Sequence, residues 1–248
     1  MIGLTRQLWV AVLTICGVAM FTHTAIAQKS DSVSTRTLII TPRLNSGGYF
    51  PFTGAYINKN VNVDVNVFYE DRIFGFFLFK SQDLKDPHSI INYLQPGIFK
   101  KIQFSPNFKL RFFAGYLFSQ TSGFRDKDSD YYTACVAYWT VNDRFKLENT
   151  ALFFDLSVSA KLANRFVLSY EQSGFKIDLF VWERVVFSTG ELSTSASLSV
   201  NFPPIRLNDR ISIQNTISCQ SYLTKTKPDF AMRDGVLFQV SFPIMAGR

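Results

Sequence analysis

The residues of this chain that could perform chemistry are few and scattered. His88 is the only histidine besides His23, and it stands directly before Ser89 in the loop-like sequence Asp86-Pro87-His88-Ser89. General-base catalysis requires a histidine and a nucleophile within hydrogen-bond reach on a rigid scaffold. Adjacent residues in a loop do not provide this arrangement, so we predict no catalytic residue and no enzymatic activity.

Carboxylates and cysteines do not predict a metal site either. Asp126, Asp128 and Asp130 alternate as in a calcium-binding loop, but the glycine and the terminal glutamate of such a loop are missing. We interpret the segment as an acidic, hydrated loop, with weak bridging of divalent cations as the alternative. Cys135 and Cys219 are too far apart in sequence to form a disulfide framework. We therefore predict no metal and no cofactor.

Residues 1–27 have the features of a secretory signal peptide. Arg6 precedes an apolar run over residues 8–21, and Ala25-Ile26-Ala27 places small residues at the spacing of a cleavage site. The run is shorter than the ~20 residues of a membrane-spanning helix. We expect cleavage before Gln28, with an uncleaved anchor as the alternative, and a short segment over residues 28–35 before the folded part.

Composition narrows the class of the folded part. Residues 1–27 contain one arginine and no acid, so cleavage lowers the formal charge from +7 to +6 (7 − 1). The basic residues are scattered, which argues against a nucleic-acid partner for an exported chain. Aromatic residues make up 16% of the chain, including 26 phenylalanines. This content is typical of a protein whose outer surface faces lipid.

The elements that would position any site are strands with alternating polarity. In residues 61–67 every odd position is valine and every even position is polar, which gives one apolar and one polar face at a side-chain period of two. The same pattern predicts about twelve strands, each long enough to cross a membrane at a tilt. The remaining candidates are residues 36–44, 72–81, 94–104, 108–112, 130–140, 144–154, 164–172, 175–179, 196–202, 211–222 and 235–243.

Connections between these strands alternate in length. Asp71 and residues 105–107, 141–143 and 173–174 are short turns, whereas residues 45–58, 82–93, 120–129 and 223–234 are longer loops. Short turns on one side and long loops on the other are typical of membrane-spanning barrels. We predict a single antiparallel transmembrane β-barrel of about twelve strands over residues 36–248, with ten strands as the alternative. The register is least certain over residues 144–172.

The end of the chain resembles a known assembly signal. Residues 235–242 are apolar at alternate positions and close on Phe242, similar to the C-terminal strand that bacterial barrel-assembly machinery recognises. With the signal peptide, the chain resembles a Gram-negative outer-membrane β-barrel protein. The resemblance implies an outer-membrane location, contact with membrane lipids and lipopolysaccharide, and assembly through this strand. One departure is that six further residues, 243–248, follow Phe242.

Charged residues on the polar faces of the strands are the candidate site. Charges at this density cannot face hydrocarbon, where each lysine or arginine costs about 2–4 kcal/mol at the midplane. They must then point into the lumen, where they either pair and plug the barrel or line a conduit. The lumen-facing candidates are Asp64, Lys109, Arg111, Lys146, Glu148, Glu171, Lys176, Asp178 and Arg184.

Aromatic residues near the predicted strand ends form a second set. Amphipathic rings favour the headgroup level of a membrane, so we expect Tyr69, Tyr116, Tyr138, Trp182 and Tyr222 to anchor the barrel there.

These patterns favour a narrow porin-like channel for small solutes. The five cations and four anions among the lumen candidates predict a small conductance with at most weak anion preference. Alternatives are a non-conducting structural or surface-binding barrel that acts through its external loops and a soluble periplasmic β-sandwich. An outer-membrane phospholipase is disfavoured, because that family carries a histidine-x-serine motif on a strand and His88 and Ser89 are adjacent.

Overall fold

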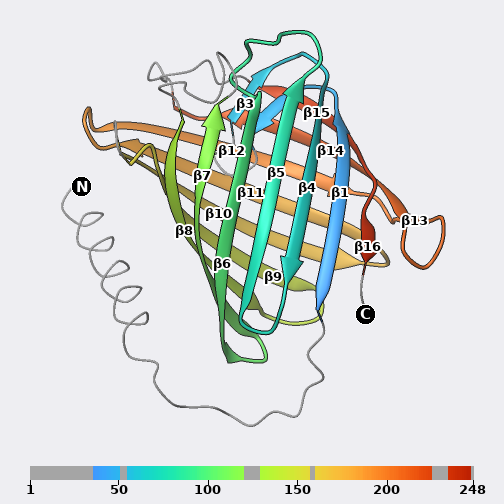
Figure 1. Cartoon of the computed structure of the whole chain (residues 1–248). Coiled ribbons are helices and arrows are strands. Elements are labelled where there is room, and N and C mark those ends of the chain that lie inside the picture. The colour runs from blue at the N-terminus through green and yellow to red at the C-terminus, as the bar shows by residue number, and fades with distance from the viewer. Residues whose placement is uncertain (1–35, 51–54, 120–128, 157–159, 225–233, 247–248) are drawn as a thin grey trace. The chain divides into compact units, whose positions relative to one another are not determined.

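A computed structural model describes residues 36–50, 55–119, 129–156, 160–224 and 234–246, and every regular element in these ranges is a strand (Figure 1). The predicted signal peptide, the segment over residues 28–35, Asp126 and Asp128 lie outside the described residues. None of the described residues forms a helix long and apolar enough to cross a membrane.

The strands are β1 (Thr37–Asn45), β2 (Gly48–Phe50), β3 (Ala55–Asn58), β4 (Asn62–Glu70), β5 (Phe74–Asp83), β6 (Tyr93–Ser105), β7 (Phe108–Ser119), β8 (Asp130–Thr140), β9 (Phe145–Phe154), β10 (Lys161–Gln172), β11 (Phe175–Val186), β12 (Glu191–Asn201), β13 (Ile205–Arg206), β14 (Ser212–Tyr222), β15 (Gly235–Ser241) and β16 (Ile244–Ala246).

Twelve of the described strands close into one antiparallel barrel, as predicted. Strands β4 to β12 each pair with the next, β12 pairs with β14, β14 with β15, and β1 joins β15 to β4 (Figure 1). Strands β2 and β3 form a separate hairpin in the connection from β1 to β4. The fold prediction is confirmed, and the alternative of ten strands is wrong.

The two ends of the barrel differ in their connections. Strands β4 and β5, β6 and β7, β8 and β9, and β10 and β11 are joined by short turns, and we call this the turn end. The opposite, loop end carries the longer connections from β1 to β4, β5 to β6, β7 to β8 and β14 to β15, whereas the long connection from β12 to β14 lies at the turn end and the short one from β11 to β12 at the loop end. Ser173 and Gly174 in the turn between β10 and β11 both have positive φ, 52° and 83°. This is the conformation of a two-residue type I′ hairpin turn, which favours glycine at Gly174.

The C-terminal strand continues beyond Phe242, where the sequence pattern ended. Ser241 of β15 pairs with Arg43, and after Pro243 the residues of β16 pair with the start of β1, with Ile244 opposite Ile40. The backbone N–H of Phe242 donates to the carbonyl of Pro42 at 2.9 Å. The last strand therefore stays in register with β1 across a proline, which lacks an N–H and interrupts the hydrogen-bond ladder.

The outer face of the barrel is apolar and exposed. Large side chains point outward on every part of its circumference, including Phe74, Ile98 and Tyr131, which are 61%, 67% and 62% exposed. Because soluble proteins rarely expose such a continuous apolar surface, the face is suited to lipid. Aromatic pairs mark its turn end, with Phe145 against Tyr170 and Phe175 against Phe202.

Three of the predicted membrane anchors are on the wrong face. Trp182 is 1% exposed and pairs with Ser195, which also pairs with Tyr222, and Tyr138 pairs with Lys109 and Glu148. All three residues therefore lie on the inner face of the barrel. Residues near a strand end can point to either face of the strand. Because side chains alternate, whether a residue stands at an odd or an even position in the strand decides if it faces lipid or the lumen.

Candidate functional site

All of the charged residues predicted to face the lumen lie on the inner face of the barrel. Direct cross-strand partners share one face of a sheet, and these partnerships connect the charged residues to the buried cluster of Phe77, Phe99, Tyr132 and Leu152. The residues so placed are Asp64, Lys109, Arg111, Lys146, Glu148, Glu171, Lys176, Asp178 and Arg184.

A cluster of cations surrounds one carboxylate at the turn end, on β4, β6 and β7. Glu70 accepts from the Nζ of Lys101 at 2.6 Å and pairs with the guanidinium of Arg111. Strand β5 lies between these partners, and Gly75 is the residue that it places opposite Glu70. A Cβ at Gly75 would lie 2.1 Å from the ring of Phe99, so glycine at this position makes room for that ring beside the cluster. Lys109 lies 5.1 Å over the ring of Tyr138.

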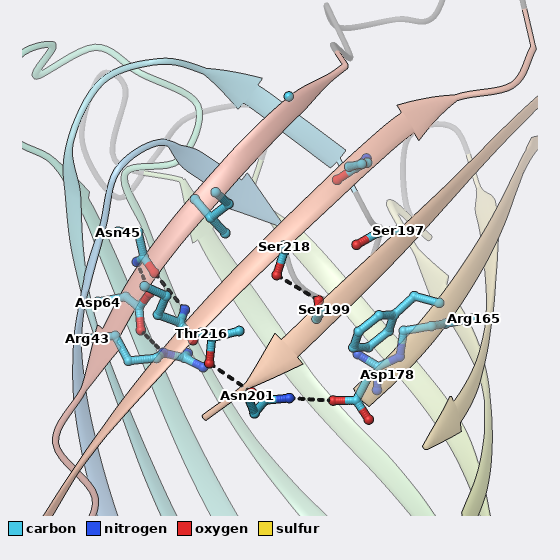
Figure 2. A pocket seen from close by; sticks show the side chains of 15 residues that line it. Arg43, Asn45, Asp64, Arg165, Asp178, Ser197, Ser199, Asn201, Thr216 and Ser218 are labelled. Atoms are coloured by element: carbon cyan, nitrogen blue, oxygen red, sulfur yellow. Dashed lines mark hydrogen bonds and ion pairs between the residues drawn. The ribbon is translucent and has the colours of Figure 1, made fainter. Parts of the chain in front are cut away.

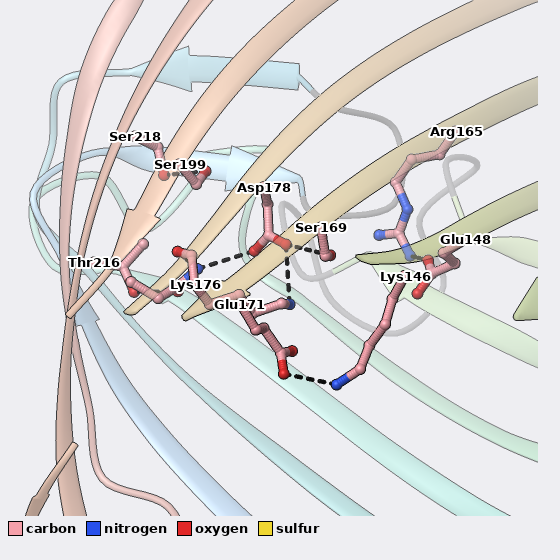
Figure 3. Close-up of polar contacts among 11 residues, drawn as sticks. Lys146, Glu148, Arg165, Ser169, Glu171, Lys176, Asp178, Ser199, Thr216 and Ser218 are labelled. Carbon is pink, nitrogen blue, oxygen red and sulfur yellow. Dashed lines mark hydrogen bonds and ion pairs between the residues drawn. The ribbon is translucent and has the colours of Figure 1, made fainter. Parts of the chain in front are cut away.

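A second group of ion pairs follows β9, β10 and β11 (Figure 3). Lys146 pairs with Glu171 at 2.7 Å, Arg165 pairs with Glu148, and Lys176 pairs with Asp178 at 3.0 Å. The partners lie on one strand or on adjacent strands. These pairs therefore hold the long side chains along the wall.

Asp178 is the centre of a hydrogen-bond network on the same wall. Its carboxylate accepts from the hydroxyl of Ser169 at 2.5 Å and from the amide of Asn201 at 2.9 Å, in addition to Lys176. The hydroxyl of Thr216 donates to Asn201 at 2.8 Å and extends the network to β14. A buried carboxylate with several donors is fully satisfied, so the network is rigid.

Asp64 is another buried carboxylate of the lumen, and it lies on the opposite side of a lumenal cavity from Asp178 (Figure 2). It accepts from the Nε of Arg43 at 2.5 Å and from the amide of Asn45 at 2.7 Å (Figure 2). The amide of Gln239 donates to Asn45 at 2.6 Å. The guanidinium of Arg43 also lies 5.4 Å over the ring of Phe79, which holds it in one orientation.

Five inward rings on β4 to β8 form an aromatic wall, which we define as Phe68, Phe77, Phe99, Phe113 and Tyr132. The ring centroids of Phe99 lie 5.0 Å from those of Phe68 and Phe113, and the rings of Phe77 and Phe113 are 5.6 Å apart. A Cβ at Gly115 would lie 2.3 Å from both the Tyr132 hydroxyl and the backbone oxygen of Pro96. Glycine is therefore required there for the tyrosine to lie against the wall.

Across the lumen lies a hydroxyl wall on β12 and β14. Between the turn end and the inward Glu191 and Tyr222 at the loop end, its inward positions carry hydroxyl and amide side chains: Ser193, Ser195, Ser197, Ser199 and Asn201 on β12, and Thr216, Ser218 and Gln220 on β14. Ser199 and Ser218 share a hydrogen bond of 2.7 Å. A cavity of about 150 Å³ lies against this wall, flanked by Arg43 and Asp64 on one side and by Arg165 and Asp178 on the other (Figure 2).

Sequence reasoning missed several of the lumenal charges. Arg43, Glu70, Lys101 and Arg165 also lie on the inner face. The hydroxyl wall was visible in part, because the alternation over residues 196–202 placed serines on one face, but they were not considered as site residues. Knowledge of the cross-strand register would have placed these four charged residues on the inner face.

The other candidates for chemistry lie at the loop end. His88 is exposed, and its backbone N–H donates to the carboxylate of Asp86 at 2.9 Å, while the Ser89 hydroxyl accepts from the amide of Asn58. Asp130 begins β8 and is buried. Among the described residues, no three His, Cys, Asp or Glu side chains gather as metal ligands.

The comparisons with known proteins identify the fold. No protein-family model matches the sequence, and no curated protein matches it. The solved structure of the NanC porin is similar over 84% of this chain and 98% of its own, with a TM-score of 0.56 and 10% identity. The KdgM porin matches 83% of this chain and 98% of its own, with a TM-score of 0.57 and 9% identity.

An outer-membrane channel from Pseudomonas putida F1 covers 90% of this chain and 99% of its own, with a TM-score of 0.52 and 7% identity. At these identities the likeness concerns the fold. The chain thus has the fold of the bacterial outer-membrane β-barrels, among which these three are channels.

Proposed function

We propose that this chain is a narrow channel of the outer membrane that passes small polar solutes along the hydroxyl wall. The observation that carries the proposal is the division of the lumen: packed rings fill one half, and the other half keeps a polar cavity of about 150 Å³. A polar cavity beyond about 15 Å³ holds water. The polar half therefore offers a hydrated route, displaced from the axis of the barrel.

The arrangement of the charges supports a conduit over a plug. In β9, β10 and β11 the ion pairs join neighbouring strands, so the side chains lie along the wall rather than across the lumen. Most cations have a carboxylate partner, and Glu70 is shared by Lys101 and Arg111. Because most of the cations are paired, we expect a small conductance with weak anion preference.

The outer surface and the ends of the chain fit the same proposal. The exposed apolar face would contact membrane lipids and, at the loop end, lipopolysaccharide. Residues 235–242 would be recognised by the barrel-assembly machinery, and residues 1–27 would be removed on export. Intact-mass measurement of the membrane-inserted protein tests the cleavage, because retention of residues 1–27 would contradict it.

Catalysis is not part of the proposal. His88 lies in a loop at the end of β5, outside the lumen wall, and its neighbour Ser89 points its hydroxyl toward Asn58. The three similar structures are channels, and one of them, the KdgM porin, has also been solved with disordered oligogalacturonate. Passage of a polar solute is therefore a function that this fold accommodates.

Single-channel recording in planar bilayers tests the proposal. Refolded protein, checked by a shift in electrophoretic mobility between boiled and unboiled samples, is expected to give small, stable current steps. Folded protein that gives no steps would contradict the channel and favour a structural barrel that acts through its external loops.

A further inference from the structure

We propose that the cavity on the hydroxyl wall is a binding subsite for an uncharged polyhydroxylated solute, such as a neutral sugar or a sugar alcohol. The inference rests on the proposed channel function and names the solute class for which this cavity is built. Its basis is the chemistry of the lining, the balance of charge around the cavity and the state of Arg43.

The lining consists mainly of groups that both donate and accept hydrogen bonds. Hydroxyls of Ser197, Ser199, Thr216 and Ser218 face the cavity together with amides of β12, β14 and β15. Each hydroxyl and each amide offers a donor and an acceptor, which matches the dual character of sugar hydroxyls. Phe180, stacked on Trp182 at 5.0 Å, adds one apolar ring to this lining, against which the C–H face of a sugar can pack.

The charges around the cavity leave no unbalanced partner for an ionic solute. Arg43 is paired with Asp64, Arg165 with Glu148, and Asp178 with Lys176. An ion that leaves water requires a counter-charge to offset its desolvation. Because the counter-charges here are already engaged with one another, the cavity favours a neutral solute over an acid or an amine of the same size.

Arg43 supplies directed donors to the cavity. Its Nε binds Asp64 and its guanidinium plane lies over Phe79, while its two terminal nitrogens make no hydrogen bond or ion pair with the described residues. The planar guanidinium is therefore held in place with its terminal N–H groups available. Such preorganised donors bind hydroxyl oxygens with little loss of side-chain entropy.

The experiment compares three solutes of one ring size that differ in charge: D-glucose, D-glucuronate and D-glucosamine. Each is added to the intact barrel in planar bilayers, and the concentration that halves the open-channel current is measured. We expect D-glucose to block at the lowest concentration. Stronger block by D-glucuronate or D-glucosamine would overturn the neutral class, and equal weak effects of all three would overturn the subsite.

Variants locate the binding. The double change Ser199→Ala and Ser218→Ala removes two hydroxyls, and since one hydrogen bond contributes about 0.5–1.5 kcal/mol, the half-blocking concentration of glucose should rise by about tenfold. Ser221→Ala is the control, because Ser221 lies on the same strand as Ser218 but faces outward, away from the cavity. An equal rise in this control would overturn the assignment.

Arg43→Lys tests the donor role while the positive charge beside Asp64 is kept. Glucose block should weaken severalfold, and the ion selectivity should stay the same, because the change removes the planar fork and not the charge. Unchanged glucose block would remove Arg43 from the subsite. The proposed function is separable from this result: loss of all conductance in the unmodified barrel would refute the channel, whereas conductance without glucose block refutes only the subsite.

Discussion

The aromatic wall and the hydroxyl wall face each other in one barrel but are built for different purposes. Phe77 and Phe99 are 5% and 2% exposed, and glycines on neighbouring strands make room for the rings. The serines of β12 carry no bulky atoms, so the space beside them stays open. Close packing stabilises a barrel and open polar space permits passage. The comparison shows that the two requirements are met on separate strands.

The largest expected effect comes from opening the aromatic wall. Phe77→Ala removes a buried ring and should lower the free energy of unfolding by about 3–5 kcal/mol. Ser197→Ala on the hydroxyl wall should change it by less than about 1.5 kcal/mol, since at most one hydrogen bond is lost. Urea titration in lipid vesicles, followed by electrophoretic mobility, measures both. Equal losses would mean that the two walls do not divide stability between them.

Filling the cavity beside the hydroxyl wall should lower the conductance. Ser218→Phe places a ring in the cavity and is expected to reduce the single-channel conductance severalfold, because conductance follows the width of the passage. Ser221→Phe is the control, since Ser221 lies on the same strand and faces outward. If both variants conduct like the unmodified protein, the route does not run along this wall.

A smaller effect is expected at the turn end of the lumen. Glu70→Gln leaves Lys101 and Arg111 without their shared carboxylate, so the reversal potential across a salt gradient should shift toward anions. Glu183→Gln removes an equal charge from the outer face and should cause no shift. Strong cation selectivity of the unmodified protein would instead contradict the inward placement of the cations.

No effect is expected from His88→Ala. His88 is exposed in the loop that follows β5 and belongs to neither wall. Conductance, unfolding and any lipid hydrolysis by the purified barrel should match the unmodified protein. A large loss of hydrolysis in this variant would restore the phospholipase alternative.

The strand order and the two faces of each strand were predictable because they are local properties. Alternation has a period of two residues, so a run such as residues 61–67 shows both its lipid side and its lumen side without knowledge of its partners. Turn formers between the runs set the hairpins and therefore the number of strands. The assignment of Asp64, Lys109 and Asp178 to the inner face required nothing more.

Two adjacent polar residues do not show which of them faces the lumen. Lys100 and Lys101 point to opposite faces, and so do Asn164 and Arg165, so each pair leaves the parity of its strand open. The pairing of Lys101 with Arg111 and of Arg165 with Trp182 decides which member enters the lumen. Trp182 was misplaced for a related reason: proximity to a strand end was given more weight than parity.

The sequence by itself determined a barrel of about twelve strands with an apolar outside and a charged inside, because side-chain alternation and turn chemistry act over a few residues. Only the tertiary structure decided that the rings gather on one half of the lumen and the hydroxyls on the other. That division depends on cross-strand register and on which strands meet when the sheet closes at β12 and β14. Contacts between residues distant in the chain cannot be found from a period of two.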